Sequence, residues 1–277
     1  TGGAATTITA GSISAGVPAM DSNVSANTTA GFSIVTWTGN GTNDGRVAHG
    51  LNAKPEFILY KTVQVANQWN AWYSVGDTNT NLVLNTDDSG SAINTATFGV
   101  PDTETISNYQ SGVGTEMVAY CWHSVPGYSA IGSYTGNGND DGTFIYTGFK
   151  PAWVMYKRTD VSGYSWDIID STRDPFNPTN STLSPNLTTS EYDELNRLEF
   201  MSNGFRNISS NAGNNASGGT YVYVAFATNP FGGLNVAPTP AALTRPKIPG
   251  LPLGPLTTIN NSLRFSGSQN LNGNFSA

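Results

Sequence analysis

The stretch that decides the fold occurs twice in this chain. Residues 31–61 read GFSIVTWTGNGTNDGRVAHGLNAKPEFILYK, and residues 127–157 read GYSAIGSYTGNGNDDGTFIYTGFKPAWVMYK. Each copy has an aromatic residue before Thr-Gly-Asn-Gly, and each has Lys-Pro before an apolar run. The copies also end alike, with Val-Ala-Tyr at 118–120 and Val-Ala-Phe at 224–226. We interpret this pattern as an internal duplication of a unit of roughly one hundred residues.

Short apolar runs separated by Gly and Asn predict β-strands throughout both copies. In the first copy the clearest are Phe57 to Tyr60, Leu82 to Leu84 and Met117 to Trp122. Runs of this length at intervals of about ten residues are typical of sandwiches and barrels. The predicted fold class is therefore all-β, with two tandem sandwich-like or jelly-roll-like domains over 31–126 and 127–232.

One short helix is predicted near residues 191–198, inside an insertion of the second copy. Ser190-Glu191-Tyr192-Asp193 has the form of a capping box, and Leu195 and Leu198 follow at helical spacing.

The flanking segments differ from the repeats. Residues 1–30 are rich in Ala, Thr, Ser and Gly, which predicts an extended N-terminal arm that lies on a neighbouring subunit or along its own domain. Residues 233–260 contain six prolines close together and predict a semi-rigid spacer. Residues 261–277 begin with the strand-like Ser262 to Phe265, which either joins another sheet or opens a further β module.

Composition excludes several classes of function. The formal net charge of −7 and the pI near 4.6 argue against nucleic-acid binding, which depends on clustered Lys and Arg. No apolar run is long enough to insert into a membrane. Charged residues make up only 11% of the chain, which favours a secreted or virion-exposed β protein over a cytosolic enzyme.

The sequence supplies no convincing catalytic group and no cofactor motif. The glycines after Thr38 and Thr135 resemble a phosphate-binding loop, but the spacing is wrong and no helix is predicted to follow, so we expect hairpin turns. Cys121 and His123 would face the same side of a strand, yet the second copy has Ala227 in place of the cysteine. A buried thiol is the simpler prediction for Cys121.

Two weak binding sites remain as hypotheses. Asp140 and Asp141 lie in a polar turn and could supply oxygen ligands to a cation such as calcium, although they match no calcium-loop pattern. Trp69, Trp72 and Tyr73 follow a polar loop and could stack on a glycan if their rings are exposed. The bland alternative for the aromatic residues is burial in the core.

The repeated motif resembles a domain found in tail-fibre-like and other virion proteins of tailed bacteriophages, especially marine ones. The resemblance covers about residues 31–232 and is carried by Tyr134 to Gly138, Lys150-Pro151 and Val224 to Phe226, with their equivalents in the first copy. It transfers no catalytic residue. It implies a structural or adhesive role on the surface of the virion.

The sequence therefore predicts a non-enzymatic virion component of the tail-fibre or tail-tip type that contacts the host surface. We expect a homo-oligomer, a trimer if the protein is a fibre, with other virion proteins and a host surface glycan as further partners. A capsid decoration or head-fibre protein is the alternative within the virion. A glycan-binding module or carbohydrate-active enzyme is the alternative of another class.

Overall fold

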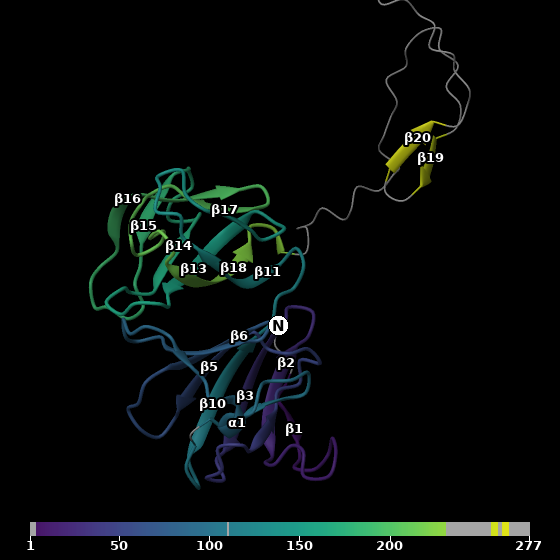
Figure 1. The fold of residues 1–277 in the computed structure, drawn as a ribbon. Helices are drawn as coiled ribbons and strands as arrows, with labels where there is room; N and C mark the ends of the chain where they lie inside the picture. The colour runs from purple at the N-terminus through teal and green to yellow at the C-terminus, as the bar shows by residue number, and fades with distance from the viewer. Residues whose placement is uncertain (1–3, 110, 231–255, 260–261, 266–277) are drawn as a thin grey trace, which may run out of the picture. The chain divides into compact units, whose positions relative to one another are not determined.

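A computed structural model describes residues 4–109, 111–230, 256–259 and 262–265 (Figure 1). The described chain is nearly all antiparallel β-structure, which confirms the predicted fold class. Its one described helix is the four-residue α1 (Thr95–Phe98). No helix in this part of the chain combines the length and apolar character needed to cross a membrane.

The first half of the chain builds an eight-stranded sheet in the order β1-β2-β3-β10-β5-β6-β7-β8. Its strands are β1 (Thr6–Ile8), β2 (Ser22–Asn27), β3 (Phe32–Thr38), β5 (Phe57–Thr62), β6 (Asn70–Val75), β7 (Thr78–Val83), β8 (Ser91–Ala92) and β10 (Glu116–Trp122). A separate pair is formed by β4 (Arg46–Ala48) and β9 (Thr105–Ser107).

The second half builds two four-stranded sheets, ordered β11-β18-β13-β14 and β12-β17-β16-β15. Their strands are β11 (Ser129–Thr135), β12 (Phe144–Tyr146), β13 (Pro151–Arg158), β14 (Asp167–Asp170), β15 (Thr179–Thr182), β16 (Tyr192–Met201), β17 (Gly204–Asn207) and β18 (Thr220–Ala227). The order β11-β18-β13-β14 matches the central order β3-β10-β5-β6 of the first half. That match is what a duplication predicts, and the duplication itself stays an inference.

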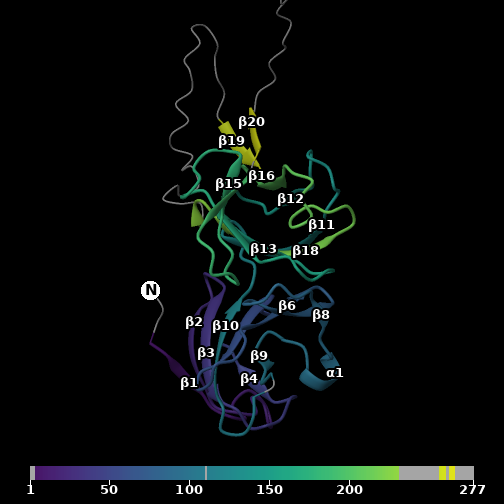
Figure 2. The same cartoon turned by 90° about the vertical axis from the view of Figure 1, so that its left-hand side faces the viewer.

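In the first half, one face of the large sheet carries its own core. Side chains alternate along a strand, so Val35 and Trp37 of β3 point to the same face as Ala119 and Cys121 of β10. Val47 of β4 and Ile106 of β9, among others, close this core from the other side. Figure 2 labels β4, β9 and α1 beside the large sheet.

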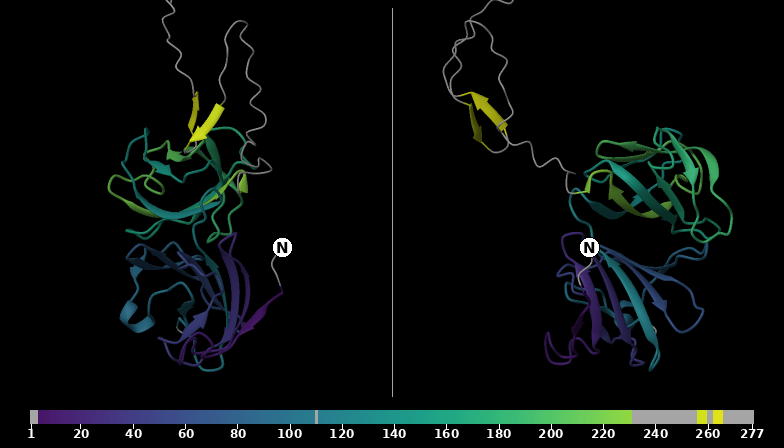
Figure 3. Two further views of the ribbon diagram at one scale, coloured as in Figure 1. Left: turned by 90° about the vertical axis from the view of Figure 1, so that its right-hand side faces the viewer. Right: turned by 180° about the vertical axis from the view of Figure 1, so that it is seen from behind.

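In the second half, the core lies between the two four-stranded sheets (Figure 3). Tyr221, Tyr223 and Ala225 of β18 pack against residues that include Phe200 of β16 and Phe205 of β17. Alternation sends Val222 and Val224 to the opposite face of β18. Both faces of this strand are therefore buried.

A third core joins the halves, because the two central sheets also pack through their opposite faces. Phe57, Tyr73 and Leu82 of the first half meet residues such as Met155 and Val224 of the second half. All five side chains are exposed by less than a tenth. The two sequence repeats are thus united by a buried sheet-to-sheet interface, which we call the seam.

The N-terminal segment is part of the first sheet. β2 pairs along its whole length with β3, and β1 pairs with β2. Met20 and Val24 are buried in the core of the first half. Of the two placements expected for the N-terminal arm, residues 4–30 take the one along their own domain, so the predicted domain boundary at residue 31 is wrong.

The predicted helix near residues 191–198 is also wrong, because β16 occupies this segment. Instead of capping a helix, Glu191 forms an ion pair with Arg173, with 2.6 Å between Oε2 and Nη1. The hydroxyl of Tyr192 donates to Asp167 at 3.0 Å. Leu198 and Phe200 are buried at strand spacing and pair with β17, so sheet pairing overrides the local helical signal.

The C-terminal residues form a separate unit over 235–277. Its described part is a hairpin of β19 (Leu256–Ile259) and β20 (Ser262–Phe265), so the strand expected at Ser262 to Phe265 is confirmed. The rest of the predicted Pro-rich spacer lies outside the described residues.

Candidate functional site

The repeated Thr-Gly-Asn-Gly motif forms a loop that an asparagine pair holds in place. In the first half, Asn108 Nδ2 donates to Asn40 Oδ1 at 3.0 Å and to the carbonyl of Thr42 at 2.8 Å. The ring N–H of Trp37 donates to Asn108 Oδ1 at 2.7 Å. Asn108 is fully buried, so these bonds replace the water that its amide loses on folding.

The second half repeats this arrangement. Asn215 Nδ2 donates to Asn137 Oδ1 at 2.9 Å and to the carbonyl of Asn139 at 2.8 Å. Asn215 is also fully buried. The motif therefore serves folding in both halves. The expectation of hairpin turns is wrong, because the strands on either side of each motif, β3 and β4 or β11 and β12, belong to different sheets. Sequence reasoning missed Asn108 and Asn215, because the partner of each motif asparagine lies far along the chain.

Two of the three aromatic residues proposed for glycan stacking are buried. Trp72 is 1% exposed and packs in the first core, and Tyr73 is 2% exposed and lies in the seam. The expectation that these rings are exposed is wrong, because both faces of β6 are covered. Trp69 is half-buried, with its ring 6.1 Å from that of Tyr120.

The two aspartates proposed as cation ligands have protein partners. Asp141 forms an ion pair with Arg206 at 2.9 Å, and Asp140 accepts the backbone N–H of Ser210 at 3.0 Å. Within the described ranges, no group of three or more His, Cys, Asp or Glu side chains converges as a metal site would require. These contacts give both aspartates a role in fixing the loop.

Cys121 and His49 are buried, whereas His123, just beyond β10, is partly exposed and its Nδ1 lies 2.9 Å from the carbonyl of Ser124. Cys121 is fully buried, as predicted, and burial raises the pKa of its thiol to about 12. His49 is also fully buried, and burial lowers its pKa to about 4. Its Nδ1 accepts the backbone N–H of Leu51 at 3.2 Å, and its Nε2 lies 3.2 Å from the carbonyl of Asp102. This neutral ring fixes a turn.

The seam contains a buried lysine at the end of the second repeat of the motif. Lys157 is fully buried, and its Nζ donates to the carbonyl of Arg158 at 2.7 Å. Burial lowers the pKa of its amine to about 8, although the carboxylates of Asp87 and Asp88, in a loop of the first half, favour the charged form. Its counterpart in the first repeat, Lys61, is partly exposed.

Polar contacts close the seam around this lysine. The ring N–H of Trp166 donates to the carbonyl of Val83 at 2.9 Å. The backbone N–H of Gly90 donates to the carbonyl of Thr159 at 2.8 Å. Because these bonds join segments of different halves, the seam is fixed by directional contacts as well as by apolar burial.

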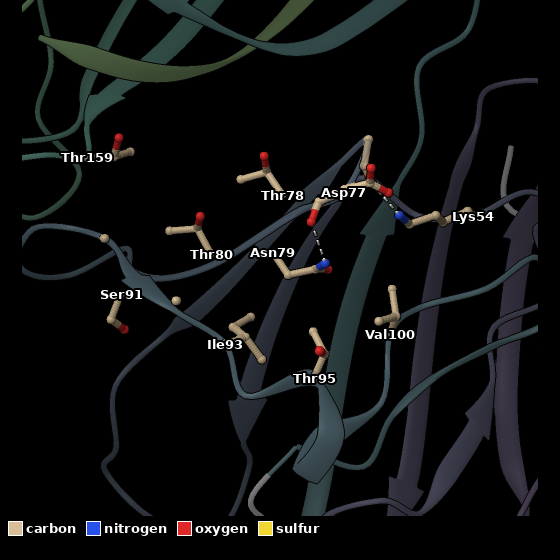
Figure 4. A pocket seen from close by; sticks show the side chains of 13 residues that line it. Lys54, Asp77, Thr78, Asn79, Thr80, Ser91, Ile93, Thr95, Val100 and Thr159 are labelled. Atoms are coloured by element: carbon tan, nitrogen blue, oxygen red, sulfur yellow. Dashed lines mark hydrogen bonds between the residues drawn. The ribbon is translucent and has the colours of Figure 1, made fainter.

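A hollow of about 650 Å³ lies beside this region and is lined in part by threonine and serine side chains (Figure 4). The polar groups at its centre are engaged by the fold. Asn79 Oδ1 accepts from Trp72 and Ser74, and its Nδ2 donates to the carbonyl of Asp77. Lys54 Nζ donates to the carbonyl of Gly76 at 3.2 Å. Because these polar groups are bonded within the protein, we interpret this part of the hollow's lining as a structural element of the fold.

A smaller groove of about 380 Å³ combines aromatic side chains from both halves with the amide of Asn27 from the first half. Phe32 and Trp122 come from the first sheet, and Tyr128 and Phe226 come from the second half. Ser25 and Asn27 of β2 complete one rim. Sequence analysis did not single out this groove, because it needs the seam and the N-terminal strand in place.

The fold is that of an all-β protein whose two halves share a buried interface, with Cys121 and His49 both buried in the first half. The family model described as domain of unknown function (DUF7483) matches residues 1–230, so the chain belongs to this family. No curated protein and no solved structure matches the chain.

Proposed function

We propose that this protein is a non-enzymatic structural and adhesive component of a tailed bacteriophage particle, of the tail-fibre or tail-tip type, which contacts the host surface. The observation that carries the proposal is the seam. It joins two similar β units through a buried core, so the chain presents its outer surfaces on a single firm support. A rigid support suits a protein whose work is attachment.

The placement of the reactive side chains supports a role without catalysis. His49 is neutral and committed to backbone contacts, and Cys121 is buried with a raised thiol pKa. Efficient acid–base or nucleophilic catalysis needs such groups within reach of a substrate. The repeated motif asparagines are likewise occupied by folding contacts.

The motif's resemblance to phage virion proteins supports the proposed location on the virion surface. The low content of charged residues is compatible with this setting. A homo-oligomer, trimeric in a fibre, is part of the proposal, and light scattering on the full chain measures it. We expect the mass of a trimer. The mass of a monomer at every protein concentration would contradict the fibre form.

Immunogold labelling tests the proposed location. Antibodies raised against the purified chain are applied to particles of a phage that carries its gene. Gold at the distal tail supports the tail-fibre or tail-tip form, and gold over the capsid selects a decoration or head-fibre protein. Unlabelled particles, with the protein free in the lysate, would contradict a virion role.

A glycan-binding module is the second candidate function, because the small groove joins aromatic faces to amide and hydroxyl groups. This role is compatible with the adhesive proposal, since host surfaces carry glycans.

A further inference from the structure

We propose that the groove between Phe32, Trp122, Tyr128 and Phe226 binds a neutral carbohydrate. This inference names a ligand class for the proposed adhesive role and rests on that role only for its biological purpose. The binding site itself is argued from the arrangement of strands and side chains.

The floor of the groove is a row of side chains fixed by strand register. Asn27 of β2 lies opposite Phe32 of β3, and Phe32 lies opposite Trp122 of β10. Neighbouring positions on adjacent strands project to the same face of a sheet. The ring centroids of Phe32 and Trp122 are 5.0 Å apart. An amide-bearing side chain therefore borders a double aromatic surface.

The second half supplies the wall of the groove. The rings of Tyr128 and Phe226 lie 5.8 Å apart. Phe226 and Trp122 also pack against the seam, so the groove is continuous with a firmly packed interface. Phe32, Trp122 and Phe226 are only partly buried, which leaves part of the surface of each ring available to a ligand.

This combination matches the chemistry of a sugar ring. A pyranose carries C–H groups on its faces and hydroxyl groups around its edge, and the electron-rich face of an aromatic ring attracts the C–H groups. Asn27 Oδ1 accepts the backbone N–H of Ala30 at 3.0 Å, which orients the amide and leaves Nδ2 as a donor for a hydroxyl. Ser25 stands on the same rim, opposite Ile34.

Charge and size narrow the choice of ligand. None of the described residues that line the groove is charged, and the whole chain carries a net charge of −7. A neutral glycan avoids both the desolvation of an unpaired charge and the repulsion of an anion. A volume of about 380 Å³ falls in the range of small-ligand sites.

The test is a screen of the full chain against an array of neutral hexose and N-acetylhexosamine oligosaccharides, followed by calorimetric titration of the best binder. Phe32→Leu and Tyr128→Leu keep an apolar side chain but remove the aromatic face. Each is expected to weaken binding at least tenfold. Phe176→Ala is the matched control, because this ring is 80% exposed and does not line the groove.

Thermal unfolding of each variant shows whether it is folded, and Asn27→Ala tests the same groove without altering an aromatic ring. Binding that is lost in the groove variants and kept in the control supports the site. Binding to no neutral glycan, or equal binding by folded groove variants, would overturn it. Self-association of the chain that Phe32→Leu abolishes would also overturn it, because a second copy would then occupy the groove. Immunogold labelling reads out the virion role separately from these results.

Discussion

The two halves of the chain carry the same motif but cover their central sheets differently. In the second half, a full four-stranded sheet closes the core. In the first half, the core is closed by the strand pair β4 and β9 and by nearby loops. In addition, β2 and β1 extend the large sheet beyond β3. Among the described residues, only the first half has a further strand, β2, on the outer side of its motif strand β3, and β2 supplies the polar rim of the groove. The lesson is that two halves with the same motif can differ in how their central sheets are covered and extended.

The largest predicted effect comes from breaking the contact that joins the halves. Trp166 of the second half is 1% exposed, its ring lies 6.2 Å from that of Phe57, and it donates to the carbonyl of Val83. Trp166→Ala should lower the free energy of unfolding by about 3–5 kcal/mol, through lost burial and an unpaired carbonyl. Urea unfolding measures the loss. The exposed Phe176→Ala should change little, and a loss below about 1 kcal/mol for Trp166→Ala would mean that the seam is not cohesive.

Acid should weaken the first half through His49. Burial lowers the pKa of His49 from 6.5 to about 4, so the unfolded chain binds this proton at a higher pH than the folded chain. The stability that the folded chain gains from keeping His49 neutral is fully present above pH 6.5. It is lost as the pH falls from about 6.5 to about 4, because the unfolded chain then binds the proton more readily. Such a difference in pKa corresponds to about 3 kcal/mol. The free energy of unfolding, measured at pH 7 and pH 4.5, should change less between the two pH values in His49→Gln than in the wild type. An equal change in both proteins would contradict the assignment of this pH dependence to His49.

Matched substitutions in the two asparagine pairs test whether the halves use the motif alike. Asn108→Ala and Asn215→Ala should each cost about 2 kcal/mol, because each leaves buried polar groups unpaired. Asn67→Ala, at an exposed loop position, is the control. Chemical denaturation of the three variants gives the comparison. A large loss in one half and none in the other would show that the motif has diverged in role.

The smallest predicted effect concerns the two motif lysines. Lys157→Met should raise the free energy of unfolding at pH 7 by about 1–2 kcal/mol, because it replaces a buried amine whose pKa is lowered to about 8. The lowered pKa of the Lys157 amine destabilises the folded wild type below about pH 10.5. The stability gained by Lys157→Met should therefore shrink as the pH rises from 8 towards 10.5. Lys61→Met, at the partly exposed equivalent, should be nearly neutral. A loss of stability in Lys157→Met would show that the seam requires the charge.

Much of the fold could be predicted from the sequence, because the strands are short apolar runs between turn residues. Phe57 to Tyr60 and Met117 to Trp122 lie in strands as expected. β2 was missed because its residues are mostly small and polar, and only Val24 marks its buried side. The local signal at 191–198 pointed to a helix, but pairing with β15 and β17 decided the outcome.

The candidate site was less predictable, because it depends on which faces are covered. Trp72 and Tyr73 point to opposite faces of β6, and only the seam explains why both are buried. The groove requires Phe32 and Phe226, which are far apart in the chain, to meet across that seam. No local pattern encodes such a meeting, so only the folded arrangement identifies these residues.

Competition for the host surface tests the adhesive role most directly. Host cells are saturated with the purified full chain, and the rate at which the phage carrying the gene adsorbs to them is measured. Our account predicts that the wild-type chain slows adsorption several-fold and that folded Phe32→Leu slows it much less. Adsorption that is unchanged by saturating wild-type protein would contradict the proposal that this protein contacts the host surface.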